Sequence, residues 1–178
     1  MTDAVEATFD TKAFRQALGQ FPTGVCIVTA RVEGTRLGMT VTSFNSLSLT
    51  PPLILFSIDR RAASLPMWEK AEAYAVNVLA ENQKGLSDRF ARSLVNKWEA
   101  AIFVDGYMGA PMLPGVTAVF ECAAFARHDG GDHRLFIGEV KRFHAHADRQ
   151  PLIFGKGRYA ALQPSEVAAP LWPLDIHY

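Results

Sequence analysis

The sequence predicts a mainly β protein in which antiparallel strands close into a barrel with short helices around it. The apolar segments are short and rich in β-branched residues, which is typical of strands. Segments with helical spacing are few and short. Strands and helices also do not alternate regularly, as they would around a parallel sheet, and this favours an antiparallel barrel.

The strands are predicted from apolar runs that end at turn-forming residues. The first run is apolar on both faces, so we expect both sides of that strand to be covered. Glu33 and Gly34 form a plausible hairpin turn after it, and residues 128–132 form another between the two longest strands. The predicted strands are residues 24–32, 37–44, 51–58, 73–79, 116–127 and 133–144.

Three stretches show the spacing of an amphipathic helix. In the first, apolar side chains four residues apart share one face and Gly19 ends the helix. The third begins at Asn82, a residue type that caps helices well. The predicted helices are Thr11–Leu18, residues 62–71 with Leu65 and Trp68 on one side, and a helix after Asn82 that carries Leu86, Phe90 and Leu94.

Length and composition are those of one globular domain. The chain has 178 residues, of which 49% are apolar and 20% charged. We therefore predict a single domain over residues 1–178, with a core at about 14–162 and a C-terminal arm at 163–178 rich in proline and aromatic residues, which is expected to pack on a partner. Cys26 and Cys122 lie in apolar runs and are expected to be buried thiols.

The charge balance limits the partners that the chain is expected to have. Lys and Arg together equal Asp and Glu in number, so no nucleic acid or acidic membrane is expected to bind by net charge. Residues 1–10 lack the basic and apolar regions of a signal peptide, and no apolar run is long enough to cross a bilayer. These features predict a cytoplasmic protein.

Two motifs resemble known binding signatures but lack the context that those signatures need. Residues 155–160 read G-x-G-x-x-A, yet no strand–helix–strand unit with a following acid can fit before the chain ends. His144 and His146 follow Gly138 with cupin-like spacing, but no second motif supplies the remaining metal ligands. A hairpin and a pair of exposed histidines are the simpler interpretations.

Small polar residues gather where the second predicted strand ends. Thr, Ser and Asn occupy most of residues 42–48, and Pro51–Pro52 then stiffen the chain. Hydroxyl groups and free backbone N–H groups suit a ligand rich in acceptors, such as the pyrimidine edge of a flavin. A plain polar loop is the alternative interpretation.

Several separated segments resemble, in order, the flavin reductase-like domain of two-component flavin-dependent monooxygenases, a family with the FMN-binding split-barrel fold. The resemblance spans about residues 14–162. The matching segments are FPTGV at 21–25, GMT at 38–40 with SF at 43–44, SLS at 46–48 and PPL at 51–53, NVL at 77–79 ahead of LSDRFA at 86–91, GDH at 131–133 with GEV at 138–140, and PL at 151–152 with GRY at 157–159.

This resemblance implies a flavin site of FMN or FAD. The flavin ring is expected against the polar segment at the strand end, and the phosphate end near a basic turn that also offers a hydroxyl and free N–H groups. The implied flavin residues are Thr42, Ser43, Phe44, Asn45, Ser46 and Ser48 for the ring and ribityl chain, Asp59, Arg60, Arg61 and Ser64 for the phosphate end, and Phe90 and Arg92 as a further wall, with helix core as the alternative for Phe90.

The resemblance also implies a reduced nicotinamide, NADH or NADPH, as the hydride donor. His133, which opens a strand after a Gly-Asp turn, is expected beside the nicotinamide as the catalytic residue, and Arg158 and Tyr159 are weaker candidates on that side. Hydride transfer to flavin N5 needs placement of the two rings rather than a protein acid, which fits the lack of a catalytic triad motif.

The implied role is an NAD(P)H:flavin oxidoreductase of homodimeric form that supplies reduced flavin to a separate monooxygenase. Two other classes stay open on the residues alone. One is a split-barrel protein that binds flavin or haem without turnover, and the other is a cupin-like metal protein that uses His144 and His146.

Overall fold

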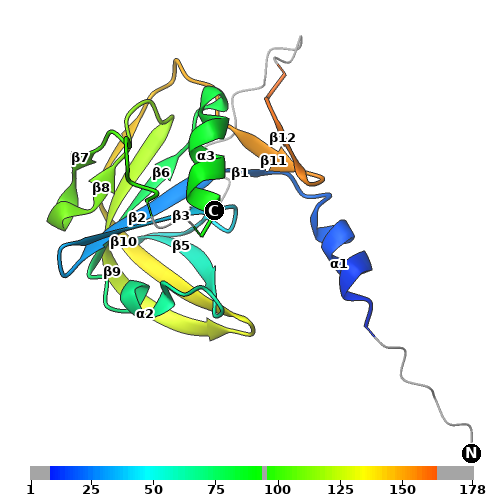
Figure 1. Ribbon diagram of the computed structural model, residues 1–178, viewed down its shortest axis with the longest axis horizontal. Helices are drawn as coiled ribbons and strands as arrows, with labels where there is room; N and C mark the ends of the chain where they lie inside the picture. Colours follow the sequence, from blue (N-terminus) through cyan, green and yellow to red (C-terminus); the bar gives the residue numbers. More distant parts are fainter. Residues whose placement is uncertain (1–8, 94–95, 164–178) are drawn as a thin grey trace, which may run out of the picture.

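A seven-stranded antiparallel sheet forms the body of the protein (Figure 1). The computed structural model describes residues 9–93 and 96–163. The strand order is β3-β2-β6-β9-β10-β5-β4, and every neighbouring pair in it is antiparallel. The bounds are β2 Cys26–Val32, β3 Thr35–Val41, β4 Asn45–Leu49, β5 Pro52–Asp59, β6 Ala73–Val78, β9 Ala118–Gly130 and β10 His133–Ala145.

The sheet curls into a barrel because its two edge strands are consecutive in the chain. Only residues 42–44 link β3 to β4, so the two edges must approach one another. At this junction the Ser43 hydroxyl accepts a hydrogen bond from the Ser57 backbone N–H at 3.0 Å and lies 3.3 Å from the Ser57 carbonyl. The predicted antiparallel barrel is therefore confirmed.

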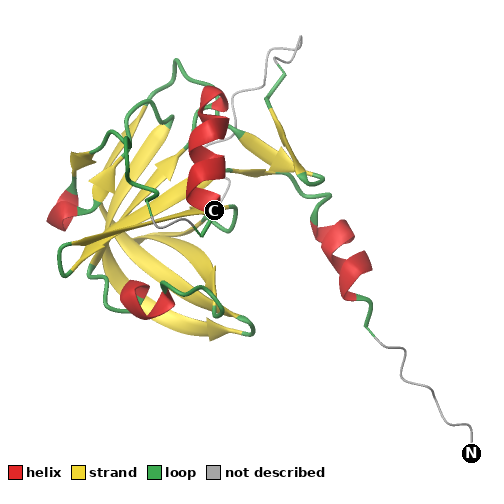
Figure 2. Cartoon of the chain, viewed as in Figure 1, coloured by secondary structure: helices red, strands yellow, loops and turns green. Residues whose placement is uncertain are grey.

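Short elements surround this barrel (Figure 2). A second sheet of three strands has the order β1-β11-β12, and β7 pairs with β8. The bounds are β1 Thr23–Gly24, β7 Val104–Asp105, β8 Pro111–Met112, β11 Ile153–Gly155, β12 Arg158–Ala160, α1 Thr11–Leu18, α2 Leu65–Trp68, α3 Lys84–Ala91, and the 3-10 turns η1 Glu81–Gln83 and η2 Tyr107–Gly109.

The core lies on both faces of the barrel wall. Inside, Phe56 stacks on Phe136 with ring centroids 5.2 Å apart, and Trp68 of α2 closes this cluster. Outside, Ile27 packs in a second cluster with Phe90 of α3. Because β2 contributes to both clusters, its sequence is apolar on both faces, as predicted.

Two hairpin turns place glycine where the backbone needs a positive φ. Glu33 and Gly34 have φ of 50° and 80°, which confirms the first predicted turn. The G-x-G-x-x-A segment is also a hairpin, because Lys156 and Gly157 have φ of 51° and 74° between β11 and β12. The dinucleotide interpretation of that segment is thereby excluded.

Three predicted boundaries were wrong. The strand at residues 37–44 ends at Val41, since the chain turns there to close the barrel and then forms β4, which was not predicted. The helix at residues 62–71 is only Leu65–Trp68, because residues 59–65 form tight turns first. Asn82 does not cap a helix: it lies inside η1, and the neighbouring Gln83 side chain accepts from the Ala80 N–H instead.

Helix α1 matches its prediction but stands away from the barrel (Figure 1). The Asp10 side chain caps it by accepting from two backbone N–H groups. None of its residues is buried, and Phe14 and Leu18 are about half exposed. Its C-terminal end is held by the β11–β12 hairpin, whose Lys156 N–H donates to the Gly19 carbonyl at 2.7 Å.

Two further expectations can be compared with the described residues. Cys26 and Cys122 are buried thiols without a disulfide, as predicted. No described helix has the length and apolar character that a membrane span requires. Leu94 and the predicted arm from residue 164 onward lie outside the described residues.

Candidate functional site

A groove of about 740 Å³ opens between the end of β3, the turn that follows β5, and the end of α3. This volume is within the range usual for small-molecule sites. Its lining combines apolar methyl groups with hydroxyl groups and charges. The lining residues are Met39, Thr40, Asp59, Arg61, Ala62, Ala63, Ser64, Ala91, Ser93 and Lys97.

One wall is the turn after β5, which an ion pair stiffens. The Arg61 backbone N–H donates to the Asp59 carboxylate at 2.8 Å, and the Arg61 guanidinium donates to the same carboxylate at 2.6 and 3.0 Å. These side-chain hydrogen bonds, followed by the backbone one, hold the pKa of Asp59 far below its usual value. The Arg61 side chain is 80% exposed, so it can reach a ligand in the groove.

The opposite wall is α3, which is fixed by a short relay of hydrogen bonds. Thr40 donates from its hydroxyl to the Ser87 carbonyl at 2.7 Å. The Ser87 hydroxyl lies 2.9 Å from the Tyr159 hydroxyl, which also donates to Asp88 at 2.8 Å. The β11–β12 hairpin therefore positions α3, and α3 in turn positions the groove-lining Thr40.

Lys97 reaches the groove from the segment after α3. Its Nζ donates to the carbonyls of Phe90 at 3.0 Å and Gly38 at 3.3 Å. Partial burial lowers the pKa of Lys97 below its ordinary value. Its Nζ forms no ion pair with a carboxylate in the described part of the chain.

His133 does not line this groove, but it lies next to a residue that does. In the β10–β5 register it is the direct partner of Asp59, whose carboxylate lines the groove. Its Nδ1 is 2.7 Å from the Asp132 carboxylate, and the side chain is 40% exposed. The structure thus places the predicted catalytic histidine beside the predicted phosphate-end turn.

Arg60 does not face the groove. Its backbone N–H donates to the Asp132 carbonyl at 2.9 Å, its Nε donates to the Gly131 carbonyl at 3.0 Å, and its guanidinium pairs with Asp129. Its hydrogen bonds therefore hold the β9–β10 hairpin against the turn after β5, and the prediction that Arg60 binds the phosphate end is not supported by this geometry.

The polar segment 42–48 runs from the groove to the sheet edge, and none of its residues lines the groove. Ser43 closes the barrel, and Phe44 stacks on Phe120 at 5.6 Å against the core. Beyond the exposed Thr42, the β4 residues Asn45 and Ser46 are exposed and Ser48 is half-buried. Their contact with a flavin stays a prediction.

Four other predicted residues lie apart from the groove. Phe90 is fully buried and packs on Trp98 at 5.0 Å, so it is a core residue and its role as a ligand wall was wrong. Arg92 caps α3 and Arg158 lies on β12, both exposed. Tyr159 does not line the groove, but its hydroxyl hydrogen-bonds Ser87, whose carbonyl accepts from the groove residue Thr40.

The structure adds groove residues that the sequence argument had not assigned. Thr40 lies in the GMT segment, where the motif gave a signal. Met39 belongs to the same GMT segment, whereas Ala63 and Ala91 lie inside the two predicted stretches at residues 59–64 and 90–92. Ser93 and above all Lys97 carry no such distinctive pattern, because only the fold brings the segment after α3 beside β3.

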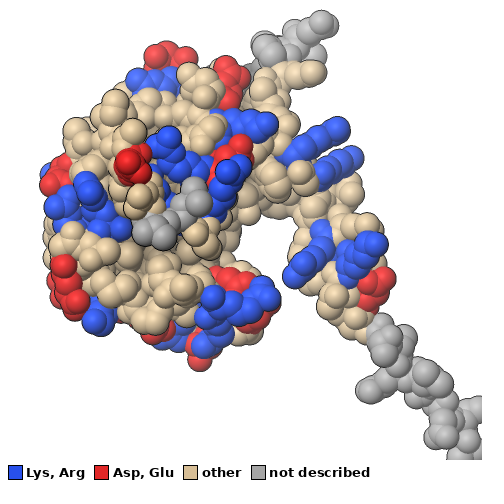
Figure 3. All heavy atoms as spheres, in the orientation of Figure 1, with Lys and Arg blue, Asp and Glu red and all other residues tan. Residues whose placement is uncertain are grey.

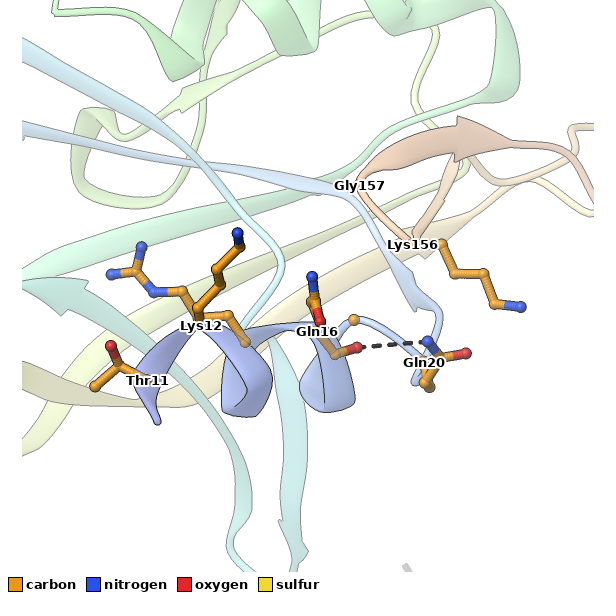
Figure 4. Close-up of a pocket in the computed structure, with 8 residues that line it drawn as sticks. Thr11, Lys12, Gln16, Gln20, Lys156 and Gly157 are labelled. Carbon is orange, nitrogen blue, oxygen red and sulfur yellow. Dashed lines mark hydrogen bonds between the residues drawn. The ribbon is translucent and has the colours of Figure 1, made fainter. Parts of the chain in front are cut away.

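A second cleft, of about 610 Å³, separates α1 from the β11–β12 hairpin (Figure 4). Lys12 and Gln16 rise from the helix, while Lys156 extends away from them at the hairpin turn. Figure 3 shows Lys and Arg on both sides of the gap between α1 and the barrel. Because Lys12 and Lys156 do not converge, this cleft lacks the geometry of a small-molecule site.

The cupin-like interpretation finds no support. His144 and His146 are exposed. Within residues 9–93 and 96–163, no group of three or more His, Cys, Asp or Glu side chains could hold a metal ion.

The residues of the groove fit a flavin. Methyl groups from Met39, Ala62 and Ala91 provide an apolar surface for a ring, and Thr40 and Ser64 provide hydroxyl groups. Two cationic side chains suit a phosphate. A split antiparallel barrel with such a groove defines the class of flavin-binding split-barrel proteins.

The chain belongs to the flavin reductase-like domain family, whose model matches residues 18–163. It is 41% identical over 150 residues to the FMN reductase (NADH) SmoA of Agrobacterium fabrum, covering 84% of this chain and 85% of that one. It is 35% identical over 173 residues to HsaB of Rhodococcus jostii, the reductase subunit of a flavin-dependent monooxygenase, covering 97% and 88%.

A solved structure shows the same fold. The NADH:FAD oxidoreductase SgcE6 of Streptomyces globisporus, in complex with NAD and FAD fragments, superposes with a TM-score of 0.84 at 34% identity. The match covers 89% of this chain and 96% of that chain. The split-barrel prediction is thereby confirmed.

Proposed function

We propose that this protein is an NAD(P)H-dependent flavin reductase that supplies reduced FMN or FAD to a separate monooxygenase. The observation that carries the proposal is the groove itself, where apolar methyls, hydroxyl groups and two cations line one cavity, and where the lining residue Asp59 pairs across the sheet with His133. Family membership and the named activities of SmoA, HsaB and SgcE6 support the same class of reaction.

The protein's own task is placement. A bound flavin would supply the redox chemistry by accepting a hydride at N5 from C4 of the nicotinamide, with a proton from water completing the reduced flavin. In this proposal Thr40, Ser64 and the Arg61 guanidinium hold the flavin, and their shared place in the groove lining supports that role. His133, whose Nδ1 contacts Asp132, is proposed to orient the nicotinamide.

NADH is the reductant that we expect, and both FMN and FAD are expected to be accepted. SmoA is named an FMN reductase that uses NADH, whereas SgcE6 is named for NADH and FAD. HsaB is named as a subunit of a monooxygenase, which supports a separate oxygenase as the partner here.

The test is a spectrophotometric assay of the purified chain with NADH and either flavin. Loss of NADH absorbance with bleaching of the flavin is the expected result. A protein that binds flavin but leaves both absorbances unchanged would instead be the non-catalytic flavin- or haem-binding alternative.

The role of His133 can be tested separately. His133→Ala is expected to slow turnover and raise KM for NADH by about tenfold, the scale of one lost hydrogen bond, while flavin affinity stays unchanged. His128→Ala is the matched control, because His128 is exposed on the same hairpin but further from Asp59. Unchanged kinetics in the His133 variant would remove the histidine from the nicotinamide site.

We also propose that the chain is one domain, works in the cytoplasm and forms a homodimer. Exposed Phe14 and Leu18 on a helix without buried residues support the dimer, since a second copy would cover them. Light scattering is then expected to give twice the chain mass of 19.6 kDa. A mass equal to that of the single chain would refute the dimer.

A further inference from the structure

Arg134 connects the two turns on either side of the candidate site. It follows His133 on β10 and is the direct partner of Asp129 across the β9–β10 hairpin. Its guanidinium donates to the Asp129 carboxylate at 2.5 Å, and its Nε lies 3.4 Å from the Glu69 carboxylate at the end of α2. The Arg134 side chain is only 25% exposed, so salt and water screen these contacts less than those of an ion pair on the open surface.

The contacts of Arg134 and Asp129 reach both ends of one groove wall. Residues 61–64 all line the groove, and Arg60 and Glu69 lie before and after them in the chain. Arg60 pairs with the Asp129 carboxylate, and Glu69 pairs with Arg134. Because Asp129 and Arg134 also pair with one another, both ends of this wall are tied to a single hairpin.

Polar contacts, and not packing, hold the tip of that hairpin. Gly131 at the tip has a φ of 66°, and a Cβ built on it would meet no atom within 4 Å. The hydrogen bond from Arg134, followed by the charge of Arg60, holds the pKa of Asp129 below its usual value. Asp129 is therefore ionised at neutral pH and binds both guanidinium groups at once.

We propose that Arg134 is a positioning residue for hydride transfer, which orients the hairpin with His133 relative to the groove wall at residues 61–64, although Arg134 does not itself line the groove. The inference rests on the proposed flavin reductase function, in which the flavin binds along this wall and the nicotinamide binds beside His133. Hydride transfer needs the donor carbon and flavin N5 about 3–3.5 Å apart, and a misplacement of about 1 Å costs about 100-fold in rate. Loss of Arg134 would release Asp129 and Glu69 from one another and permit such a misplacement.

Stopped-flow measurement of flavin reduction by NADH, with both ligands saturating, tests the proposal on the full chain. Arg134→Met keeps an apolar stem and removes the charge. We expect it to lower the rate constant of flavin reduction by about 10- to 100-fold and to change the Kd of the flavin far less. Lys141→Met is the matched control, because Lys141 lies on the same strand and pairs with Glu139, away from both turns and the groove lining, and it should change neither value.

Deuterated NADH separates positioning from a purely structural role. Deuterium at the transferred position of C4 slows the hydride step itself and so identifies the phase that reports it. In Arg134→Met we expect this deuterium-sensitive phase to have a lower rate constant. A structural role alone would reduce the amount of folded protein, which lowers the amplitude of the phase and leaves its rate constant unchanged. An unchanged rate constant, with or without a loss of amplitude, would overturn the proposal.

Arg134→Lys is a second and milder variant. Its ammonium keeps the charge but cannot bridge Asp129 and Glu69 as the longer guanidinium does, so we expect a rate constant between those of Arg134→Met and the unchanged protein. A rate constant equal to that of the unchanged protein would overturn the bridging role.

Failure of the proposal differs from failure of the proposed function. If Arg134 does not position the hairpin, the unchanged protein and both variants reduce flavin at the same rate, and the reductase function stands. If the chain is not a flavin reductase, the unchanged protein itself consumes no NADH and shows no deuterium-sensitive phase, which overturns both.

Discussion

Gly38 lies beneath the groove at a point where the structure has no room for a methyl group. A Cβ built on Gly38 would be 2.4 and 2.6 Å from two ring carbons of Phe90 and 3.0 Å from a ring carbon of Trp98. Ordinary contacts begin at 3.4 Å, so the Phe90 ring would have to recede by about 1.0 Å (3.4 minus 2.4). Phe90 is fully buried in a core cluster, and protein cores are close-packed.

The expected cost of Gly38→Ala follows from this geometry. Overpacking a core by one methyl group typically costs about 1–3 kcal/mol, and the lower backbone entropy of alanine returns about 0.5–1 kcal/mol. The net loss in the free energy of unfolding is therefore about 0–2.5 kcal/mol, with the upper half expected because the clash is with a buried ring. Because the Phe90 carbonyl holds Lys97, we also expect a weaker affinity for FMN.

Urea unfolding, followed by tryptophan fluorescence, measures this loss. Gly85→Ala is the matched control, since a Cβ at Gly85 would meet no atom within 4 Å and alanine favours the helix there. We expect the control to be neutral or more stable by up to about 1 kcal/mol. If Gly38→Ala unfolds at the same urea concentration as Gly85→Ala, the close packing of β3 against α3 is wrong.

Two further predictions concern the relay and the thiols. Tyr159→Phe removes the hydroxyl that bonds Ser87 and Asp88, and we expect it to lower stability by about 1 kcal/mol and to raise KM for flavin more than it lowers kcat; an effect on kcat alone would argue against a positioning role. Burial raises the pKa of Cys26 and Cys122 from 9.0 to about 12, so a thiol reagent at pH 8 should label them only after unfolding. Rapid labelling of the native protein would contradict the buried placement of the two thiols. Because the pKa of each thiol is higher in the folded state than in the unfolded state, the stabilisation that comes from burying the neutral thiols is present below pH 9 and is lost as the pH rises from 9 toward 12.

Sequence patterns predicted the barrel well because its strands carry their own signals. The Glu33–Gly34 turn and the two long strands around residue 131 are local features, and each formed close to where it was expected. The short strand β4 was missed although Leu47 and Leu49 alternate with Ser46 and Ser48, because the run has only five residues and its Asn and Ser residues are typical of a loop.

The candidate site was harder to predict, since its residues come from distant segments. The turn with Asp59 and Arg61 was found, but Arg60 and Phe90 were assigned to the ligand although the fold uses them elsewhere. Adjacent arginines look equivalent in a sequence, and only the position of the β9–β10 hairpin separates their roles. Lys97 had no signal, because its closeness to β3 depends on how α3 ends.

Arg60 has a consequence for how the two ligands meet. Its backbone N–H, its Nε and its guanidinium all bind the β9–β10 hairpin. They therefore hold the corner with Asp59, the turn after β5, against the corner with His133, the β9–β10 turn, although the two corners are far apart in the sequence. The separation of these two corners is thus set by the protein's own hydrogen bonds. Because the two turns are already held in place, ligand binding does not have to include the entropy cost of ordering them. In the proposed site, Arg60 would therefore set the spacing of hydride donor and acceptor without contacting either.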